Sequence, residues 1–381
     1  MSFVIENTTA VTPSGVLEHA SIKIEDSRIV EIRQWSFSGN GARFDARHCH
    51  AFPGFVDIHS DAIEKEIEPR PGAIFPLPIV LYELDKKLAA CGITTMFHSV
   101  SFNDGAAHLR SNRVAVDIIA KLNDAIPRMK TNTKIHARYE ITDRSAIPFL
   151  HTLMENRMVH LLSVMDHTPG QGQFREVMTF RDYYGRVYRK TDEELDRIIE
   201  QKLSSRASTE ESLRMIIDLA RHFFLPIASH DDDSSNKIHF LRSLGVSISE
   251  FPVTMDAARA ASESDMHVCL GAPNIIRGGS QITNLSAREA IMEGLGDVIV
   301  SDYSPMSVLH AICILNKLGI RPLHEAVGMA SINPARAVGI ADRTGSLEVG
   351  KEADIVLVDA TEEVFRIVKT FVSGREVFST T

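Results

Sequence analysis

Apolar and polar residues alternate in two different ways along the chain, which predicts two kinds of structure. Residues 2–50 and 354–378 alternate with the period of two that is typical of half-buried strands, with turn residues between the runs. Neither region shows a long helical pattern. Because the two ends of a domain often lie close together, we predict that residues 1–52 and 343–381 form one small β-domain.

Between these ends, continuous apolar runs alternate with helix-like stretches, as in a parallel sheet covered by helices. Eight such runs can be counted: Phe55–His59, Ile93–Val100, Lys134–Ile141, Val159–Met165, Pro226–His230, Val246–Phe251, His267–Leu270 and Val298–Ser301. A helical pattern fills several gaps, for example from Leu77 to Leu88, where it stops at Gly92. The chain is therefore predicted to be an α/β protein, with a (β/α)8 TIM-type barrel over residues 53–342.

One connection, residues 168–225, is too long for a simple crossover. Thr191 and Glu194 have the spacing of a helix capping box, and Ser208 and Glu211 repeat it ahead of an amphipathic run. We interpret this segment as a partly helical insertion that acts as a lid or as a contact in a homodimer.

Composition narrows the possible partners. The 381 residues are 44% apolar and 24% charged with a net charge of −9, so a broad nucleic-acid surface is not expected, although a few local arginines can still bind a small anion. No run approaches the ~20 apolar residues that span a membrane, and the N-terminus does not resemble a secretory signal. The four cysteines form no CxxC pair. These features favour a cytoplasmic protein without a membrane partner.

Polar side chains follow several apolar runs at the point where each predicted strand ends, which in a barrel is the face of the active site. His59 and Asp61 are two residues apart, so an extended strand directs both to one face, and this pair of groups suits a divalent cation. Glu140 can bridge two metal ions, or it can pair with Arg138 or Arg144. Each of these residues alone can also be an ordinary solvated or ion-paired strand end.

Three later strand ends extend the set. His167 and His230 each follow an apolar run, and one carboxylate of Asp231–Asp233 is expected to orient His230 through its second ring nitrogen. Asp302 follows the last run, where it can act as a ligand and can accept a proton from a metal-activated water, or can simply cap a turn. The predicted metal set is therefore His59, Asp61, Glu140, His167, His230 and Asp302.

The loop after the seventh run has features of a phosphate site. Gly278, Gly279 and Ser280 let backbone N–H groups approach an anion, and a helix is expected to begin near Ser286. Arg277 can bind a phosphate through two donors, and Arg70 can reach in from the first loop. A flexible turn and surface ion pairs are the alternatives.

Several motifs resemble the amidohydrolase superfamily: Pro53-Gly-Phe-Val-Asp-Ile-His59, the separated histidines, Asp302, Asn333-Pro-Ala-Arg336 and Gly345–Val356. The resemblance implies the barrel, the terminal β-domain and one or two divalent ions, with zinc, manganese and nickel all suited. There are departures. Most members have HxH where this chain has His59-Ser-Asp61, and many have a carboxylated lysine where Glu140 is the candidate. His167 and His230 fall one strand earlier than usual, so either our strand count has slipped or the barrel is irregular.

These departures point to one branch. Four blocks, His59–Gly72, Ser229–Asp233, Ile248–Pro252 and Gly271–Ser280, are similar to the PhnM-type family of the carbon–phosphorus lyase pathway. That family hydrolyses α-D-ribose 1-methylphosphonate 5-triphosphate to the 5-phosphate and pyrophosphate, which implies a phosphorylated small-molecule substrate. Two alternatives stay open: a C–N hydrolase of the same superfamily, such as a cyclic amidase or deaminase, and a catalytically inactive barrel that serves as a binding subunit.

Overall fold

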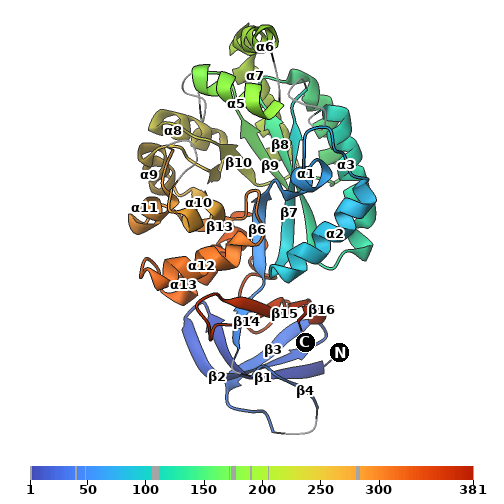
Figure 1. The fold of residues 1–381 in the computed structure, drawn as a ribbon, viewed down its shortest axis with the longest axis vertical. Coiled ribbons are helices and arrows are strands. Elements are labelled where there is room, and N and C mark those ends of the chain that lie inside the picture. The colour runs from blue at the N-terminus through green and yellow to red at the C-terminus, as the bar shows by residue number, and fades with distance from the viewer. Residues whose placement is uncertain are drawn as a thin grey trace.

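The structure is a computed structural model, and it describes residues 2–38, 41–47, 49–104, 111–170, 172, 177–188, 191–204, 206–279 and 284–380. It contains a small sheet built from both ends of the chain and a separate eight-stranded sheet built from the middle (Figure 1). Both predicted parts are thus present, and the α/β prediction is confirmed.

The small sheet joins segments that are far apart in the sequence. Its strands are β1 (Ser2–Thr12), β2 (Gly15–Glu25), β3 (Arg28–Gln34), β4 (Ala42–Asp45), β5 (His50–Pro53), β14 (Ile355–Asp359), β15 (Arg366–Val372) and β16 (Arg375–Ser379). They run in the order β16-β15-β14-β5-β1-β2-β3, with β4 beside β1. The alternating pattern buries one side of these strands, including Ile5, Ile22 and Leu357, in a core of their own.

The second sheet is a parallel barrel whose strands follow one another in chain order. They are β6 (Phe55–Ser60), β7 (Ile93–Phe102), β8 (Asn132–Glu140), β9 (Leu161–Met165), β10 (Ile227–His230), β11 (Ile248–Glu250), β12 (His267–Gly271) and β13 (Val298–Val300). Each strand overlaps one of the eight predicted runs, so the predicted barrel is confirmed and the strand count has not slipped. His167 and His230 do follow the fourth and fifth strands.

The first and last barrel strands meet at their carboxyl ends. Asp302 donates its backbone N–H to the carbonyl oxygen of His59 over 3.2 Å, and the N–H of Asp61 donates to the carbonyl of Asp302 over 2.7 Å. A parallel bridge between Ser60 and Asp302 marks the same closure. The barrel therefore closes where the sequence predicts the functional residues.

Helices cover the outside of the barrel. They are α1 (Ala62–Ile67), α2 (Leu77–Ala90), α3 (Asn112–Ala125), α4 (Ile147–Glu155), α7 (Arg206–His222), α8 (Ser235–Leu244), α9 (Met255–Glu263), α10 (Ala272–Arg277), α11 (Ala287–Met292), α12 (Ser307–Lys317), α13 (Leu323–Met329) and α14 (Ile332–Ala337). In α2 the predicted apolar face is buried, and Gly92 follows the helix with a positive φ of 75°. Among the described residues, no helix is both long and apolar enough to cross a membrane.

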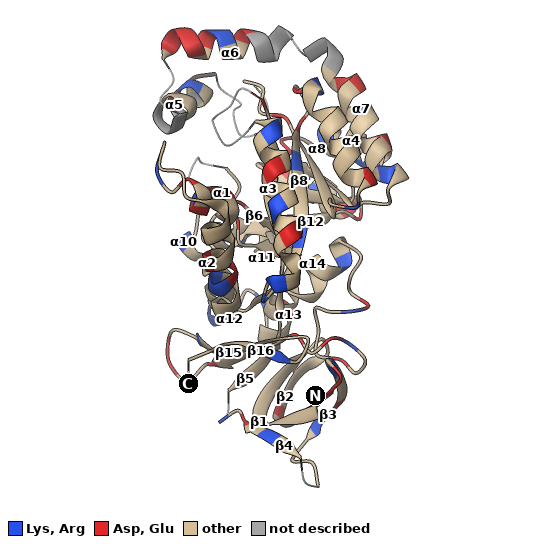
Figure 2. Ribbon diagram, turned by 90° about the vertical axis from the view of Figure 1, so that its right-hand side faces the viewer, with Lys and Arg blue, Asp and Glu red and all other residues tan. Residues whose placement is uncertain are grey.

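The long connection adds two helices, α5 (Val177–Tyr188) and α6 (Asp192–Ser204), at the end of the barrel away from the small sheet (Figures 1 and 2). Phe180 and Leu195 bring them together in a small apolar cluster of their own. The capping box of Thr191 and Glu194 is confirmed by its two reciprocal hydrogen bonds. The second predicted box is wrong, because α7 begins before Ser208. The lid and the homodimer contact stay predictions.

Gly345, where the chain returns to the small sheet, provides a stability test. Its φ is +90°, and an added Cβ would lie 2.9 Å from the carbonyl oxygen of Ser331. Gly350 has a similar φ of +92°, but open space surrounds its Cβ position. We expect Gly345→Ala to lower the free energy of unfolding by about 2 kcal/mol more than Gly350→Ala, since only the first adds a backbone clash to the strain. Equal shifts in thermal unfolding midpoint would contradict this assignment.

Candidate metal centre

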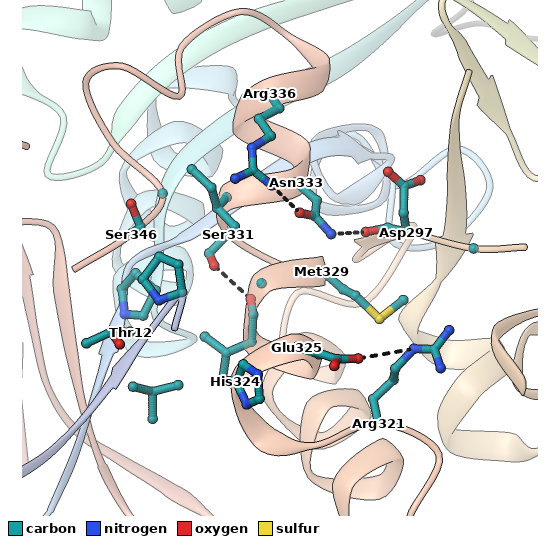
Figure 3. Close-up of a pocket in the computed structure, with 18 of the residues that line it drawn as sticks. Thr12, Asp297, Arg321, His324, Glu325, Met329, Ser331, Asn333, Arg336 and Ser346 are labelled. Atoms are coloured by element: carbon teal, nitrogen blue, oxygen red, sulfur yellow. Dashed lines mark hydrogen bonds and ion pairs between the residues drawn. The ribbon is translucent and has the colours of Figure 1, made fainter. Parts of the chain in front are cut away.

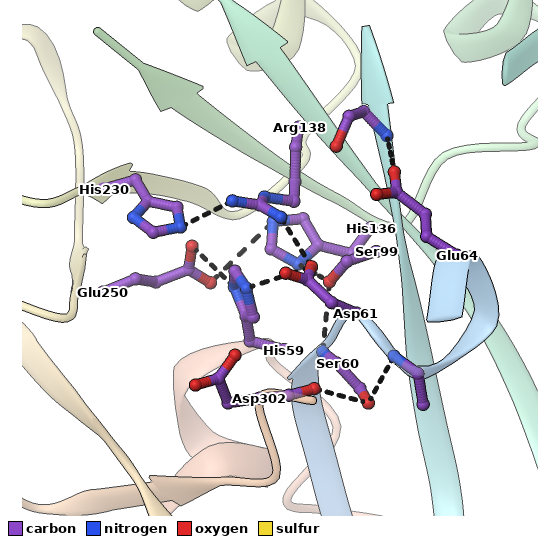
Figure 4. A network of polar contacts seen from close by, with 12 residues as sticks. His59, Ser60, Asp61, Glu64, Ser99, His136, Arg138, His230, Glu250 and Asp302 are labelled. Carbon is purple, nitrogen blue, oxygen red and sulfur yellow. Dashed lines mark hydrogen bonds and ion pairs between the residues drawn. The ribbon is translucent and has the colours of Figure 1, made fainter. Parts of the chain in front are cut away.

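A cluster of buried polar side chains fills the carboxyl end of the barrel (Figure 4). The strands β6, β8, β10 and β11 contribute His59, His136, Arg138, His230 and Glu250, and Asp61 and Asp302 join them just past β6 and β13. These side chains meet because the carboxyl ends of all barrel strands face the same opening. Polar residues from distant parts of the sequence are thus gathered at one rim.

His59, His230 and Glu250 lie close enough to share one cation. One potential ligand atom from each lies within 4.8 Å of the other two, and all three side chains are buried. The Nδ1 atom of His59 is 3.0 Å from Oε2 of Glu250, and the rings of His59 and His230 are 5.2 Å apart between centroids. Two imidazoles and a carboxylate are ordinary ligands for zinc and related divalent metals.

The hydrogen bonding of this trio fits a bound cation. Among the described residues, Nδ1 of His59 and both carboxylate oxygens of Glu250 are buried without a hydrogen-bond partner. Leaving one such group unsatisfied costs about 1–3 kcal/mol, so three together need an explanation, and a cation that binds lone pairs provides one. Burial, and then the charge of Arg138, lowers the pKa of His59 to about 3. The ring is therefore neutral at pH 7 and keeps a lone pair for a metal.

Arg138 lies inside the cluster. Its Nη1 donates to Oδ1 of Asp61 over 2.5 Å, and its Nη2 lies 2.7 Å from Nε2 of His230. The pairing of Glu140 with Arg138 or Arg144, the alternative that the sequence offered, stays a prediction. A fixed positive charge thus lies between two of the predicted ligands.

Glu140 and His167 form a pair beside the trio. Nδ1 of His167 lies 2.7 Å from Oε2 of Glu140, and the ring of His167 is 6.2 Å from that of His230. The carboxylate of Asp231 lies 3.3 Å from Nδ1 of His230, the position expected for a group that orients the imidazole. Asp232 instead accepts hydrogen bonds from the hydroxyl groups of Ser229 and Ser249, so its role is structural.

Asp302 occupies a strained position at the rim. Its φ is +56°, and two residues that directly follow barrel strands, Asp231 and Phe251, have φ of +53°. Non-glycine residues adopt this region rarely, and such strain is concentrated at functional sites. Burial, and then the charge of Asp61, raises the pKa of Asp302 to about 7. Its carboxyl group can therefore exchange a proton near neutral pH.

The residues predicted to bind phosphate are outside this buried cluster. Arg277 is the exposed last residue of α10, and Gly278 ends that helix with a left-handed φ of 78°. Gly279 follows it half-buried, Arg70 is exposed in the turn after α1, and Ser280 is outside the described residues. The predicted helix near Ser286 is present as α11. Substrate binding by Arg70, Arg277, Gly278 and Gly279 stays a prediction.

Three members of the cluster were not singled out as site residues from the sequence. Glu250 ends the sixth strand just as Glu140 ends the third, so the same rule of a carboxylate after an apolar run could have found it. His136 and Arg138 precede Glu140 by four and two residues, and alternation along β8 directs all three to one face. That spacing was the available signal for both.

A cavity of about 450 Å³ lies at the opposite end of the barrel, between β13 and the small sheet (Figure 3). Residues that precede barrel strands line it, including Pro53 and Asp297, so it is remote from the carboxyl ends of the strands. Asn333 donates to the carbonyl of Asp297 over 2.8 Å, and Arg336 donates to Asn333 over 3.2 Å. The Asn333–Arg336 motif thus has a structural role in the wall of this cavity.

Comparison with known proteins agrees with this arrangement. Residues 204–377 match the amidohydrolase family. The chain is 31% identical to alpha-D-ribose 1-methylphosphonate 5-triphosphate diphosphatase of Escherichia coli (strain K12), over 98% of this chain and 100% of that protein. Imidazolonepropionase of Thermoplasma acidophilum is 23% identical, over 91% of this chain and 84% of its own. The crystal structure of dihydropyrimidinase from Brevibacillus agri has the same fold, with a TM-score of 0.68 at 14% identity, over 100% of this chain and 95% of that one.

The barrel, the terminal sheet and the rim of histidines and carboxylates define a hydrolase of the amidohydrolase type. The chain belongs to the amidohydrolase superfamily, in the branch that contains the E. coli diphosphatase. The departures noted in the sequence are retained in the structure, where Glu140 ends the third barrel strand and His167 follows the fourth.

Proposed function

We propose that this chain is a divalent-metal-dependent hydrolase of a phosphoric anhydride, which converts α-D-ribose 1-methylphosphonate 5-triphosphate to the 5-phosphate and pyrophosphate. The observation that carries the proposal is the 31% identity to the E. coli diphosphatase over 98% of this chain and 100% of that protein. The cluster at the rim supports it, because cleavage of an anhydride by water needs a site that activates water and neutralises phosphoryl charge.

His59, His230 and Glu250 would hold the cation, with Glu140 and His167 adjoining. When bound, the cation would lower the pKa of water and neutralise charge on phosphoryl oxygens. The carboxylate of Asp302 accepts the proton of the attacking water and can return it to the leaving pyrophosphate. Arg138 contributes a fixed positive charge beside the site, and the closed rim of the barrel holds these side chains close to one another.

The test is turnover of the ribose methylphosphonate triphosphate by the full chain with added Zn²⁺, Mn²⁺ or Ni²⁺, with the phosphorus products identified by ³¹P NMR. We expect equal amounts of pyrophosphate and the 5-phosphate. His230→Ala is expected to abolish this turnover while the far-UV circular dichroism stays that of the unchanged protein. A folded, metal-loaded protein that releases no pyrophosphate, or releases single phosphates instead, would contradict the proposal.

C–N bond hydrolysis is the second candidate, favoured by the 23% identity to an imidazolonepropionase over most of the chain. The same ligands could activate water for either reaction, so the metal centre does not separate them. Parallel assays of ammonia release and of ring opening of cyclic amides would do so. Turnover there, without pyrophosphate release from the triphosphate, would favour this candidate.

A further inference from the structure

The position of Arg138 bears on how the chain binds its metal. The guanidinium is buried at the centre of the cluster, with one nitrogen on Asp61 at 2.5 Å and another 2.7 Å from Nε2 of His230. Figure 4 shows it between these two side chains. Arg138 therefore contacts two of the residues that were predicted to bind the cation.

The contact with His230 has a definite direction. A guanidinium is always protonated and carries only N–H donors, so Nε2 of His230 must be the acceptor. A neutral imidazole has one N–H and one lone pair, which places the ring proton on Nδ1, where it faces Asp231 at 3.3 Å. The one lone pair of His230 is thus used by Arg138.

A metal ion needs the same lone pair. We propose that Arg138 competes with the divalent cation for Nε2 of His230 and so sets the affinity of the site, while Asp61 retains the guanidinium rather than binding the metal. This inference rests on the metal centre proposed above. It follows that the affinity for metal is weaker than two histidines and a glutamate would give without Arg138.

Asp61 has a clear part in this competition. Its carboxylate holds the guanidinium at the rim, so a cation that takes His230 displaces Arg138 from the imidazole but not from Asp61. Oδ1 of Asp61 lies 3.8 Å from Nε2 of His59, farther than its 2.5 Å contact with Arg138. Loss of the Asp61 carboxylate should therefore loosen Arg138 without removing a ligand.

The experiment is a Zn²⁺ titration of the full chain, stripped with a chelator and then measured by competition with a chelating dye. Arg138→Met removes every donor and keeps an unbranched side chain, and we expect it to lower the Kd for Zn²⁺ at least tenfold. Arg138→Lys keeps the charge but loses the planar fork that reaches two partners, so it should also bind more tightly than the unchanged protein. Asp61→Asn loosens Arg138 and removes no ligand, so it should bind Zn²⁺ at least as tightly as the unchanged protein.

Each result separates the possibilities. An unchanged or higher Kd in Arg138→Met would overturn the competition, and tightening in Arg138→Met with none in Arg138→Lys would replace it by a through-space charge effect. Loss of binding in Asp61→Asn would make Asp61 a ligand and overturn its assigned role. If the unchanged protein binds no Zn²⁺, the proposed metal centre itself is wrong. If it binds Zn²⁺ and substitution of Arg138 has no effect, only the competition is wrong. Should Arg138→Met not fold, Arg138→Lys and Asp61→Asn still decide the matter.

Discussion

Glu250→Gln is expected to lose its bound metal and to lower turnover at least about a thousandfold, while the protein stays folded. Both oxygens of Glu250 are buried without a hydrogen-bond partner in the described part of the chain, and one lies 3.0 Å from Nδ1 of His59. An amide of the same shape is a far poorer ligand for a divalent cation than a carboxylate. Elemental analysis of the purified protein and the pyrophosphate assay measure the two effects.

The thermal stability of metal-stripped Glu250→Gln provides a second measurement. It is expected to stay equal or to rise, whereas metal content and turnover fall. Burial raises the pKa of Glu250, so its ionised form is less favourable in the folded than in the unfolded chain. Its carboxyl therefore contributes most to stability at low pH, and that contribution is lost as pH rises through the folded pKa. We expect the variant to melt at or above the midpoint of the metal-stripped parent at pH 8, and this advantage to shrink toward pH 4.

Glu211→Gln is the matched control, because Glu211 is exposed and forms a surface ion pair with Arg144. It should keep its metal, its activity and its unfolding midpoint. The assignment of Glu250 as a ligand would be wrong if Glu250→Gln behaved like this control.

Asp302→Asn is expected to lower kcat by about 10²–10⁴-fold, the usual contribution of a general base, while the metal content stays that of the unchanged protein. Asp302 is not among the three residues whose ligand atoms converge. Its amide replacement can still make the backbone hydrogen bonds that close the barrel, because these use main-chain atoms. A loss of metal in this variant would instead identify Asp302 as a ligand, as the sequence also suggested.

The pH dependence of kcat tests the same residue. A base must be ionised, so the rate should rise with pH through the pKa of Asp302 and then level off. Burial and Asp61 raise that pKa to about 7, and a cation bound nearby lowers it again, so the rise is expected at or below pH 7. The acidic limb should be absent in Asp302→Asn. An unchanged limb in the variant would assign the titration to another group.

Much of the fold could be predicted from the sequence. The barrel strands are almost entirely buried, so they appear as apolar runs separated by amphipathic helices, and all eight are found in order. The terminal sheet has the other pattern, because one side of its strands faces solvent. The start of α7 was missed because Ser208 fits a cap by spacing alone, whereas the helix already includes Arg206.

The site was only partly predictable, for a physical reason. A strand end identifies a residue at the rim, as for His59, His230 and Asp302, but does not say which rim residues meet. Glu250 lies inside the predicted run Val246–Phe251, whereas the strand itself ends at Glu250, so it was not recognised as a strand end. The hydrogen bond of Arg138 to Asp61 depends on the closed barrel bringing the ends of β6 and β8 into reach. Sequence spacing contains no such information.

The most direct test is an anomalous diffraction map from crystals of the full chain grown with Zn²⁺ and collected at the zinc edge. We expect a peak at the carboxyl end of the barrel, at about 2.0–2.2 Å from a nitrogen of His59, a nitrogen of His230 and an oxygen of Glu250. Arg138 should then be displaced from His230. A fully occupied zinc bound elsewhere, with this trio unchanged, would contradict the account.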